Sequence, residues 1–167
     1  MTNFFDKCLV TMFGLGKVKT IPGTIGSLVT VIILYNLFHT FNVSLNKILL
    51  VLIIIFIYSF YAVANYIKYS ENKDPKEIVI DEFIGQSIPI YLYEISHGTD
   101  KSSEEAFIFY IICFLLFRFF DIIKPFPVNF FDKNFKNSFG VIMDDVCAGF
   151  YVVLSLICYM VLTNYFM

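Results

Sequence analysis

Long runs of apolar residues are the feature that most limits what this chain can fold into. Five such stretches occur, at approximately 25–41, 48–64, 83–95, 106–120 and 146–163. A helix needs about 20 apolar residues, and at least roughly 17, to cross the hydrocarbon core of a bilayer. The second and fifth stretches meet this requirement without any charged residue. The third is short and contains Gln86 and Pro89, and the fourth carries Arg118 near its end. These two stretches could form a shallow or re-entrant pair, or be helices buried among the others.

The composition of the 167-residue chain agrees with a membrane environment. Hydrophobic residues make up 58% and charged residues 16%, against roughly 25% charged residues in soluble domains. A soluble domain of this size could not bury so much apolar surface. The apolar runs do not alternate with period two, and an open sheet cannot exist in hydrocarbon. We therefore predict one all-α membrane domain over residues 1–167, with four to five apolar helices.

The distribution of lysine and arginine predicts how these helices cross. If the chain crosses at all five stretches, ten of its twelve basic residues fall on one side, and that side should be cytoplasmic by the positive-inside rule. The ten are Lys7, Lys17, Lys19, Lys68, Lys73, Lys76, Arg118, Lys124, Lys133 and Lys136, whereas Lys47 and Lys101 fall on the other side. A model with four crossings that skips 83–95 would scatter these charges.

Several functional classes are disfavoured by the same data. The net charge of −2 gives no basic field for nucleic acid. The four cysteines are widely spaced, without a CxxC pattern, so neither a zinc site nor a disulfide framework is indicated. The N-terminal segment lacks the features of a cleaved signal peptide. No Cys-x5-Arg or paired-histidine phosphatase signature is present.

A glycine-rich segment at 14–27 opens the first apolar stretch. Glycines let the backbone approach a ligand closely, and the N–H groups at a helix N-terminus favour anions. Thr24, Gly26 and Ser27 are therefore candidates for phosphate binding. The alternative is a helix-entry loop that is capped by Thr24 or Ser27.

Five carboxylates stand at the ends of apolar stretches on the same predicted side. They form two adjacent pairs and one single residue: Asp81 and Glu82, Asp144 and Asp145, and Asp121. Asp81 and Asp144 could each be explained as a helix cap. Mg²⁺ is usually held by a few carboxylates together with phosphate oxygens, so we predict that all five carboxylates form one Mg²⁺ site.

Arg118, Asp121 and Lys124 follow one another at spacings of three residues. This spacing predicts one face of a helix that Pro125 ends. The alternative to a functional role is a salt-bridged helix end, with Lys124 near the last carbonyl groups. Because cations can bind phosphate, Arg118 and Lys124 complete the predicted phosphate site.

These segments resemble the phosphatidylglycerophosphatase A family, in the family's order, from about Phe13 to Tyr151. The matching motifs are PGTIGS at 22–27, IVIDEFIG at 78–85, Phe117-Arg118 with Asp121 and KPFP at 124–127, and IMDDV at 142–146 with Ala148-Gly149. The resemblance implies a Mg²⁺-dependent enzyme of the bacterial inner membrane that hydrolyses phosphatidylglycerophosphate to phosphatidylglycerol and phosphate. The active site would face the cytoplasm.

Two other functional classes remain as alternatives. One is another Mg²⁺-dependent phospholipid enzyme, although the Asp-Gly-x-x-Ala-Arg signature of CDP-alcohol phosphatidyltransferases is absent. The other is a small membrane transporter. In that class, intramembrane polar residues line a pathway, whereas the charges here gather at one face.

Overall fold

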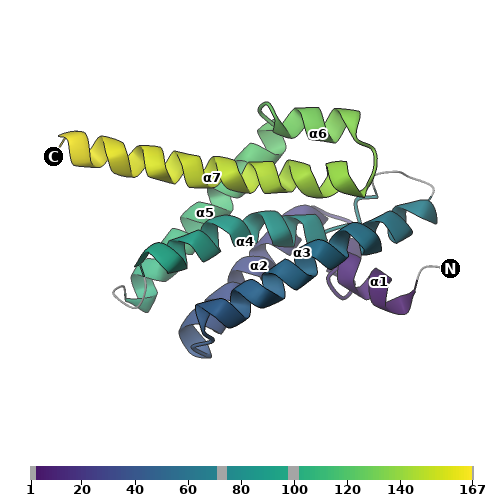
Figure 1. The fold of residues 1–167 in the computed structure, drawn as a ribbon, viewed down its shortest axis with the longest axis horizontal. Coiled ribbons are helices and arrows are strands. Elements are labelled where there is room, and N and C mark those ends of the chain that lie inside the picture. Colours follow the sequence, from purple (N-terminus) through teal and green to yellow (C-terminus); the bar gives the residue numbers. More distant parts are fainter. Residues whose placement is uncertain (1–2, 71–74, 98–101, 167) are drawn as a thin grey trace.

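The computed structural model describes residues 3–70, 75–97 and 102–166. Over these residues the chain forms seven α-helices and no strand (Figure 1), which confirms the predicted all-α fold. The helices are α1 (Phe4–Val10), α2 (Pro22–Tyr35), α3 (Leu45–Lys68), α4 (Ile80–His97), α5 (Ser103–Ile123), α6 (Val128–Asn134) and α7 (Ser138–Phe166). A single π-helical turn, Asn36–Thr40, extends α2.

Four of the five predicted apolar stretches each lie within one long helix, and the first, 25–41, runs through α2 and the π-helical turn and ends one residue beyond that turn. The helices extend past the apolar runs because the polar residues beside those runs are also helical. The extension is largest in α7, which begins at Ser138, eight residues before the predicted stretch. The short helices α1 and α6 were not predicted, since seven residues are too few for a clear apolar periodicity.

Four segments are long and apolar enough to cross a membrane. They are Pro22–Thr40, Leu45–Lys68, Ser103–Ile123 and Ser138–Tyr165. The α4 helix is different, because its 18 residues include three carboxylates and are mostly buried. Its polar groups are therefore shielded by the other helices, as a polar helix within a bilayer requires.

The α4 helix lies in the centre of the bundle, with α7 on one side and α2 and α3 on the other (Figure 1). Its closest neighbour is α7, and two glycines permit the approach. A Cβ atom on Gly85 would lie 2.5 Å from the carbonyl oxygen of Asp145, and one on Gly149 would overlap the carbonyl oxygen of Gly85. Small residues let membrane helices pack backbone to backbone in this way. The contact fixes the first turn of α4 beside the first turns of α7.

The five long helices run alternately between two ends of the bundle. One end carries a pocket that is lined by the starts of α2, α4 and α7 and by the end of α5. At the other end, Glu94 of α4 accepts a hydrogen bond of 2.8 Å from Tyr110 of α5 and lies 3.1 Å from Nε2 of His39. Of the basic residues that were counted for topology, Lys73 and Lys101 lie outside the described residues.

Candidate active site

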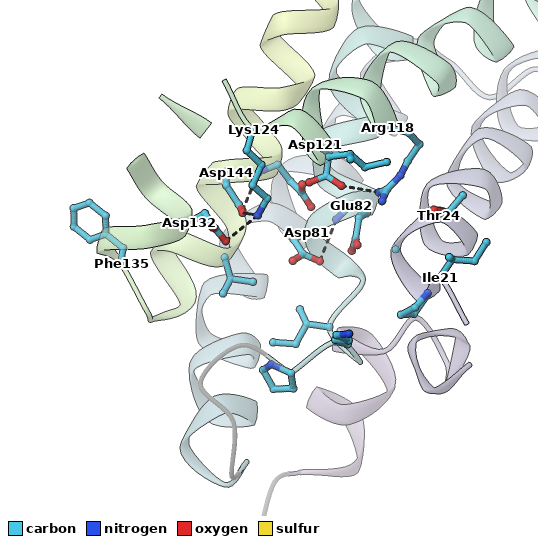
Figure 2. A pocket seen from close by; sticks show the side chains of 18 of the residues that line it. Ile21, Thr24, Asp81, Glu82, Arg118, Asp121, Lys124, Asp132, Phe135 and Asp144 are labelled. Atoms are coloured by element: carbon cyan, nitrogen blue, oxygen red, sulfur yellow. Dashed lines mark hydrogen bonds and ion pairs between the residues drawn. The ribbon is translucent and has the colours of Figure 1, made fainter. Parts of the chain in front are cut away.

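A cavity of about 400 Å³ lies at the end of the bundle where four long helices meet. Its walls come from the start of α2, the segment before α4, the end of α5, α6 and the beginning of α7 (Figure 2). Segments separated by more than 100 residues thus share one pocket. All five carboxylates that the sequence singled out line it: Asp81, Glu82, Asp121, Asp144 and Asp145.

Three of these carboxylates form a compact cluster. Oxygen atoms of Asp81, Glu82 and Asp145 all lie within 4.8 Å of one another. Asp145 is 4% exposed, and Oε2 of Glu82 is buried without a hydrogen-bond partner among the described residues. Like charges at this separation repel strongly in a partly buried site. The donor set therefore fits a hard divalent cation such as Mg²⁺, which prefers carboxylate oxygens.

Gly23 makes room for this cluster on the α2 side. A Cβ atom at position 23 would collide with Oε1 of Glu82 and would lie 3.4 Å from Nη1 of Arg118. The first turn of α2 therefore lies directly against Glu82. Because the first N–H groups of a helix have no intrahelical partners, this turn brings a positive helix end to the carboxylate cluster.

Asp121 lies beside the cluster but is paired with a cation. Nη1 of Arg118 lies 2.9 Å from Oδ2 of Asp121, in the i, i+3 arrangement that the sequence predicts. The same Nη1 donates a hydrogen bond of 3.3 Å to Oγ of Ser27 on α2. Nε of Arg118 is buried and has no hydrogen-bond partner among the described residues. Arg118 thus connects α5 to α2 and keeps one buried donor for a further acceptor.

Lys124 lies outside α5. The prediction that Lys124 shares one helix face with Arg118 and Asp121 is therefore wrong for Lys124. The helix ends at Ile123, and Lys124 adopts a left-handed conformation with φ of 50°. A residue before proline is driven out of the α region by the proline ring, and Pro125 follows. Nζ of Lys124 instead donates hydrogen bonds to Oδ1 of Asp132 at 2.8 Å and to Oδ2 of Asp144 at 3.0 Å (Figure 2).

Neither Asp81 nor Asp144 is the helix cap that the alternative interpretation required. Ile80 is the first residue of α4, so Asp81 lies inside its first turn. Asp144 lies more than one turn inside α7, which begins at Ser138. Among the described residues, Oδ1 of Asp81 accepts a hydrogen bond from the backbone N–H of Glu82 and Oδ1 of Asp144 accepts one from that of Asp145, while Oδ2 of Asp144 accepts one from Lys124. Capping therefore does not explain these two carboxylates.

Some residues of the glycine-rich segment line the pocket, whereas others pack against neighbouring parts of the helices. Gly23 and Thr24 line the pocket, but Gly26 and Ser27 do not. Gly26 lies against Val79, whose Cβ would be 3.1 Å from an added Cβ. Ser27 donates a hydrogen bond of 2.9 Å to the carbonyl oxygen of Gly23, inside α2. The suggested cap by Thr24 or Ser27 is therefore wrong, because Ile21 holds the N-cap position.

Three charged residues of the pocket were not singled out from the sequence. They are Asp132, Lys76 and Lys136. Asp132 pairs with Lys124 across the turn that joins α5 to α6, and no helical spacing relates the two residues. The one sequence feature that relates to this contact is the KPFP motif at 124–127, because its prolines end α5 and lead the chain into α6.

The chain is similar to curated phosphatases over most of its length. A family model described as phosphatidylglycerophosphatase A matches residues 8–160. A putative phosphatidylinositol-3-phosphatase of Bacteroides thetaiotaomicron is 33% identical over 150 residues, which are 89% of each chain. A phosphatidylglycerophosphatase A of Haemophilus influenzae is 34% identical over 146 residues, 87% of this chain and 83% of the relative. The corresponding protein of Escherichia coli is 28% identical over 141 residues, 84% of this chain and 75% of the relative. No solved structure matches the chain.

Proposed function

The chain belongs to the phosphatidylglycerophosphatase A family, and we propose that it is a Mg²⁺-dependent membrane phosphatase that hydrolyses phosphatidylglycerophosphate to phosphatidylglycerol and phosphate. The observation that carries the proposal is the meeting of Asp81, Glu82 and Asp145 with Arg118 in one pocket. The proposal includes a role in phosphatidylglycerol synthesis at the bacterial inner membrane, with the pocket on the cytoplasmic side.

Asp81, Glu82 and Asp145 are the residues that would hold Mg²⁺, and Asp121 and Asp144 lie beside them. A bound Mg²⁺ ion supplies Lewis acidity toward phosphate oxygens and charge for the transition state. The buried and unpaired Oε2 of Glu82 supports this assignment. The paired state of Asp121 and Asp144 suggests that these two mainly orient Arg118 and Lys124.

The protein's own groups provide the rest of the chemistry. Arg118, Gly23 and Thr24 line the pocket, and we expect the guanidinium group and the first N–H groups of α2 to bind the phosphate oxygens. Hydrolysis requires a water to attack phosphorus while the bond from phosphorus to the lipid oxygen breaks. A carboxylate of the cluster orients or deprotonates that water, and the released alkoxide takes up a proton to give phosphatidylglycerol.

The test is phosphate release by purified protein across a Mg²⁺ titration, with phosphatidylglycerophosphate in mixed micelles. Asp81→Asn and Asp145→Asn preserve side-chain size, and we expect each to lower turnover by about 100-fold or more, equivalent to about 2.7 kcal/mol. Glu94→Gln is the matched control, because it changes a buried carboxylate at the remote end of the same helix as Asp81. Normal turnover and Mg²⁺ dependence in both Asn variants would refute the metal site.

A second substrate is supported by the Bacteroides relative, which is described as a putative phosphatidylinositol-3-phosphatase. Phosphatidylinositol 3-phosphate also presents a phosphomonoester on a diacyl lipid, so the same pocket chemistry applies. Parallel assays with both lipids distinguish the two, and we expect kcat/KM to be higher for phosphatidylglycerophosphate. A higher value for the inositol lipid would reassign the substrate.

A further inference from the structure

Two highly exposed aliphatic side chains lie among the charged residues that line the pocket. Ile21 is 61% exposed and Ile122 is 71% exposed, and both line the cavity. The other aliphatic side chains in the lining, Ile78 and Val141, are buried at 4% and 8% exposure. Ile21 and Ile122 thus face both the phosphate site and the surroundings of the protein.

The two isoleucines lie where two membrane-length helices meet the pocket. Ile21 directly precedes α2, and Ile122 lies in the last turn of α5. Arg118 precedes Ile122 by one helical turn, so the two share a helix face, and Arg118 hydrogen-bonds Ser27 of α2. The α2 and α5 helices therefore approach each other at the same level as the pocket. Both are long and apolar enough to cross a membrane.

The backbone of Ile21 is held in an unusual conformation. Its φ and ψ angles are 50° and 51°, in the left-handed region, where a β-branched residue is rare and strained. Strain of this kind is concentrated at functional sites. Here it holds an isoleucine at the rim of a phosphate pocket.

We infer that Ile21 and Ile122 form a lateral portal through which the acyl-bearing glycerol of the lipid substrate leaves the phosphate pocket toward the bilayer, between α2 and α5. This inference rests on the proposed phosphatase function. The phosphomonoester binds among Arg118 and the carboxylates, whereas the apolar part of the same molecule contacts the two isoleucines. The portal lets a lipid remain in the membrane while its phosphate is hydrolysed, and it favours diacyl substrates over soluble phosphate esters.

The test compares two neighbouring isoleucines on α5. Ile122→Asn removes the apolar contact, and Ile122→Leu preserves it. Ile123→Asn is the matched control, because Ile123 is 57% exposed but does not line the pocket. Phosphate release is measured with long-chain phosphatidylglycerophosphate in mixed micelles of varied mole fraction, and with its deacylated, water-soluble counterpart.

We expect Ile122→Asn to raise KM for the long-chain lipid about tenfold, with kcat within about twofold of the original, because it removes part of the apolar contact energy. Its kcat/KM for the deacylated compound should not change. Ile123→Asn and Ile122→Leu should behave as the unaltered protein with both substrates. Equal effects of Ile122→Asn and Ile123→Asn, or equal loss with both substrates, would overturn the portal.

A binding experiment separates the portal from the proposed function. In the Asp81→Asn variant, a photoreactive benzoylphenylalanine in place of Ile122 should crosslink a radiolabelled phosphatidylglycerophosphate in vesicles more efficiently than radiolabelled phosphatidylcholine. The same group in place of Ile123 should crosslink both lipids equally. If the group at position 122 preferred phosphatidylglycerophosphate but the unaltered protein released no phosphate, the proposed function would be refuted and the portal would still be supported. Turnover without that preference would refute the portal alone.

Discussion

Lys124 donates hydrogen bonds to Asp132 and Asp144 from a backbone that has already left α5. Burial on its own would lower the pKa of Lys124, but the hydrogen bonds and charges of the two aspartates outweigh burial and raise the pKa above its ordinary value. Burial would raise the pKa of Asp132, yet Lys124 outweighs that effect and lowers it. The pair is therefore ionised in the folded protein at neutral pH.

The lowered pKa of Asp132 predicts how stability depends on pH. A carboxylate whose pKa is lower in the folded state stabilises above its unfolded pKa of about 3.9, and this contribution is lost as pH falls through the folded value. Because its pKa is raised, Lys124 itself stays positively charged until strongly alkaline pH. We expect Asp132→Asn to destabilise the protein at pH 7 by at most about 1 kcal/mol, because both side chains are partly exposed.

Thermal unfolding in detergent at pH 7 and pH 3 measures this effect. The difference between the original protein and Asp132→Asn should shrink at pH 3. Glu104→Gln, which removes an exposed carboxylate in the first turn of α5, controls for the loss of one negative charge. A difference for Asp132→Asn that is the same at both pH values would show that the ion pair does not stabilise the fold.

At the scale of helices, the contact between α4 and α7 decides whether the carboxylates meet. Gly85 and Gly149 allow the two backbones to touch. Asp81 lies one turn before Gly85, and Asp145 lies one turn before Gly149 with its carbonyl oxygen against Gly85. We expect Gly149→Ala to cost about 1–3 kcal/mol, as overpacking does in a core. It should also lower turnover of the folded protein, because the carboxylates would separate.

Leu154→Ala provides the control on the same helix, since Leu154 is 56% exposed. Thermal stability and phosphate release are measured for both variants. If Gly149→Ala were as stable and as active as Leu154→Ala, close packing at this crossing would not be needed to form the site.

The sequence predicts the long helices well because each contains a long, mostly apolar run. It also places Asp81, Glu82, Asp121, Asp144 and Asp145 at one end, since each stands at the end of an apolar run. It does not predict the pairing of Lys124 with Asp132, which depends on the turn after Pro125. Nor does it predict that Asp144 lies well inside a helix, because Gly140 and the adjacent pair Asp144 and Asp145 interrupt the apolar pattern before Val146.

At the scale of the whole molecule, charge is distributed unevenly between the two ends. Among the described residues, Lys76, Lys124 and Lys136 line the pocket at one end, whereas Lys47 lies in the first turn of α3 at the other end. Because α4 runs between the same two ends as the four membrane-length helices, the pocket residues stay together on the lysine-rich side. The positive-inside rule then predicts that the pocket faces the cytoplasm.

Cysteine labelling tests this orientation in a variant without the four native cysteines. Lys76 lines the pocket and is exposed, and Ser44 is exposed in the connection between α2 and α3 at the opposite end. An impermeant maleimide applied to intact bacterial cells should label Ser44→Cys but not Lys76→Cys, because only the first side chain would face outward. After permeabilisation both should react, which shows that Lys76→Cys is accessible in the folded protein. Labelling of Lys76→Cys from outside intact cells would invert the topology and place phosphate release on the outer side of the membrane.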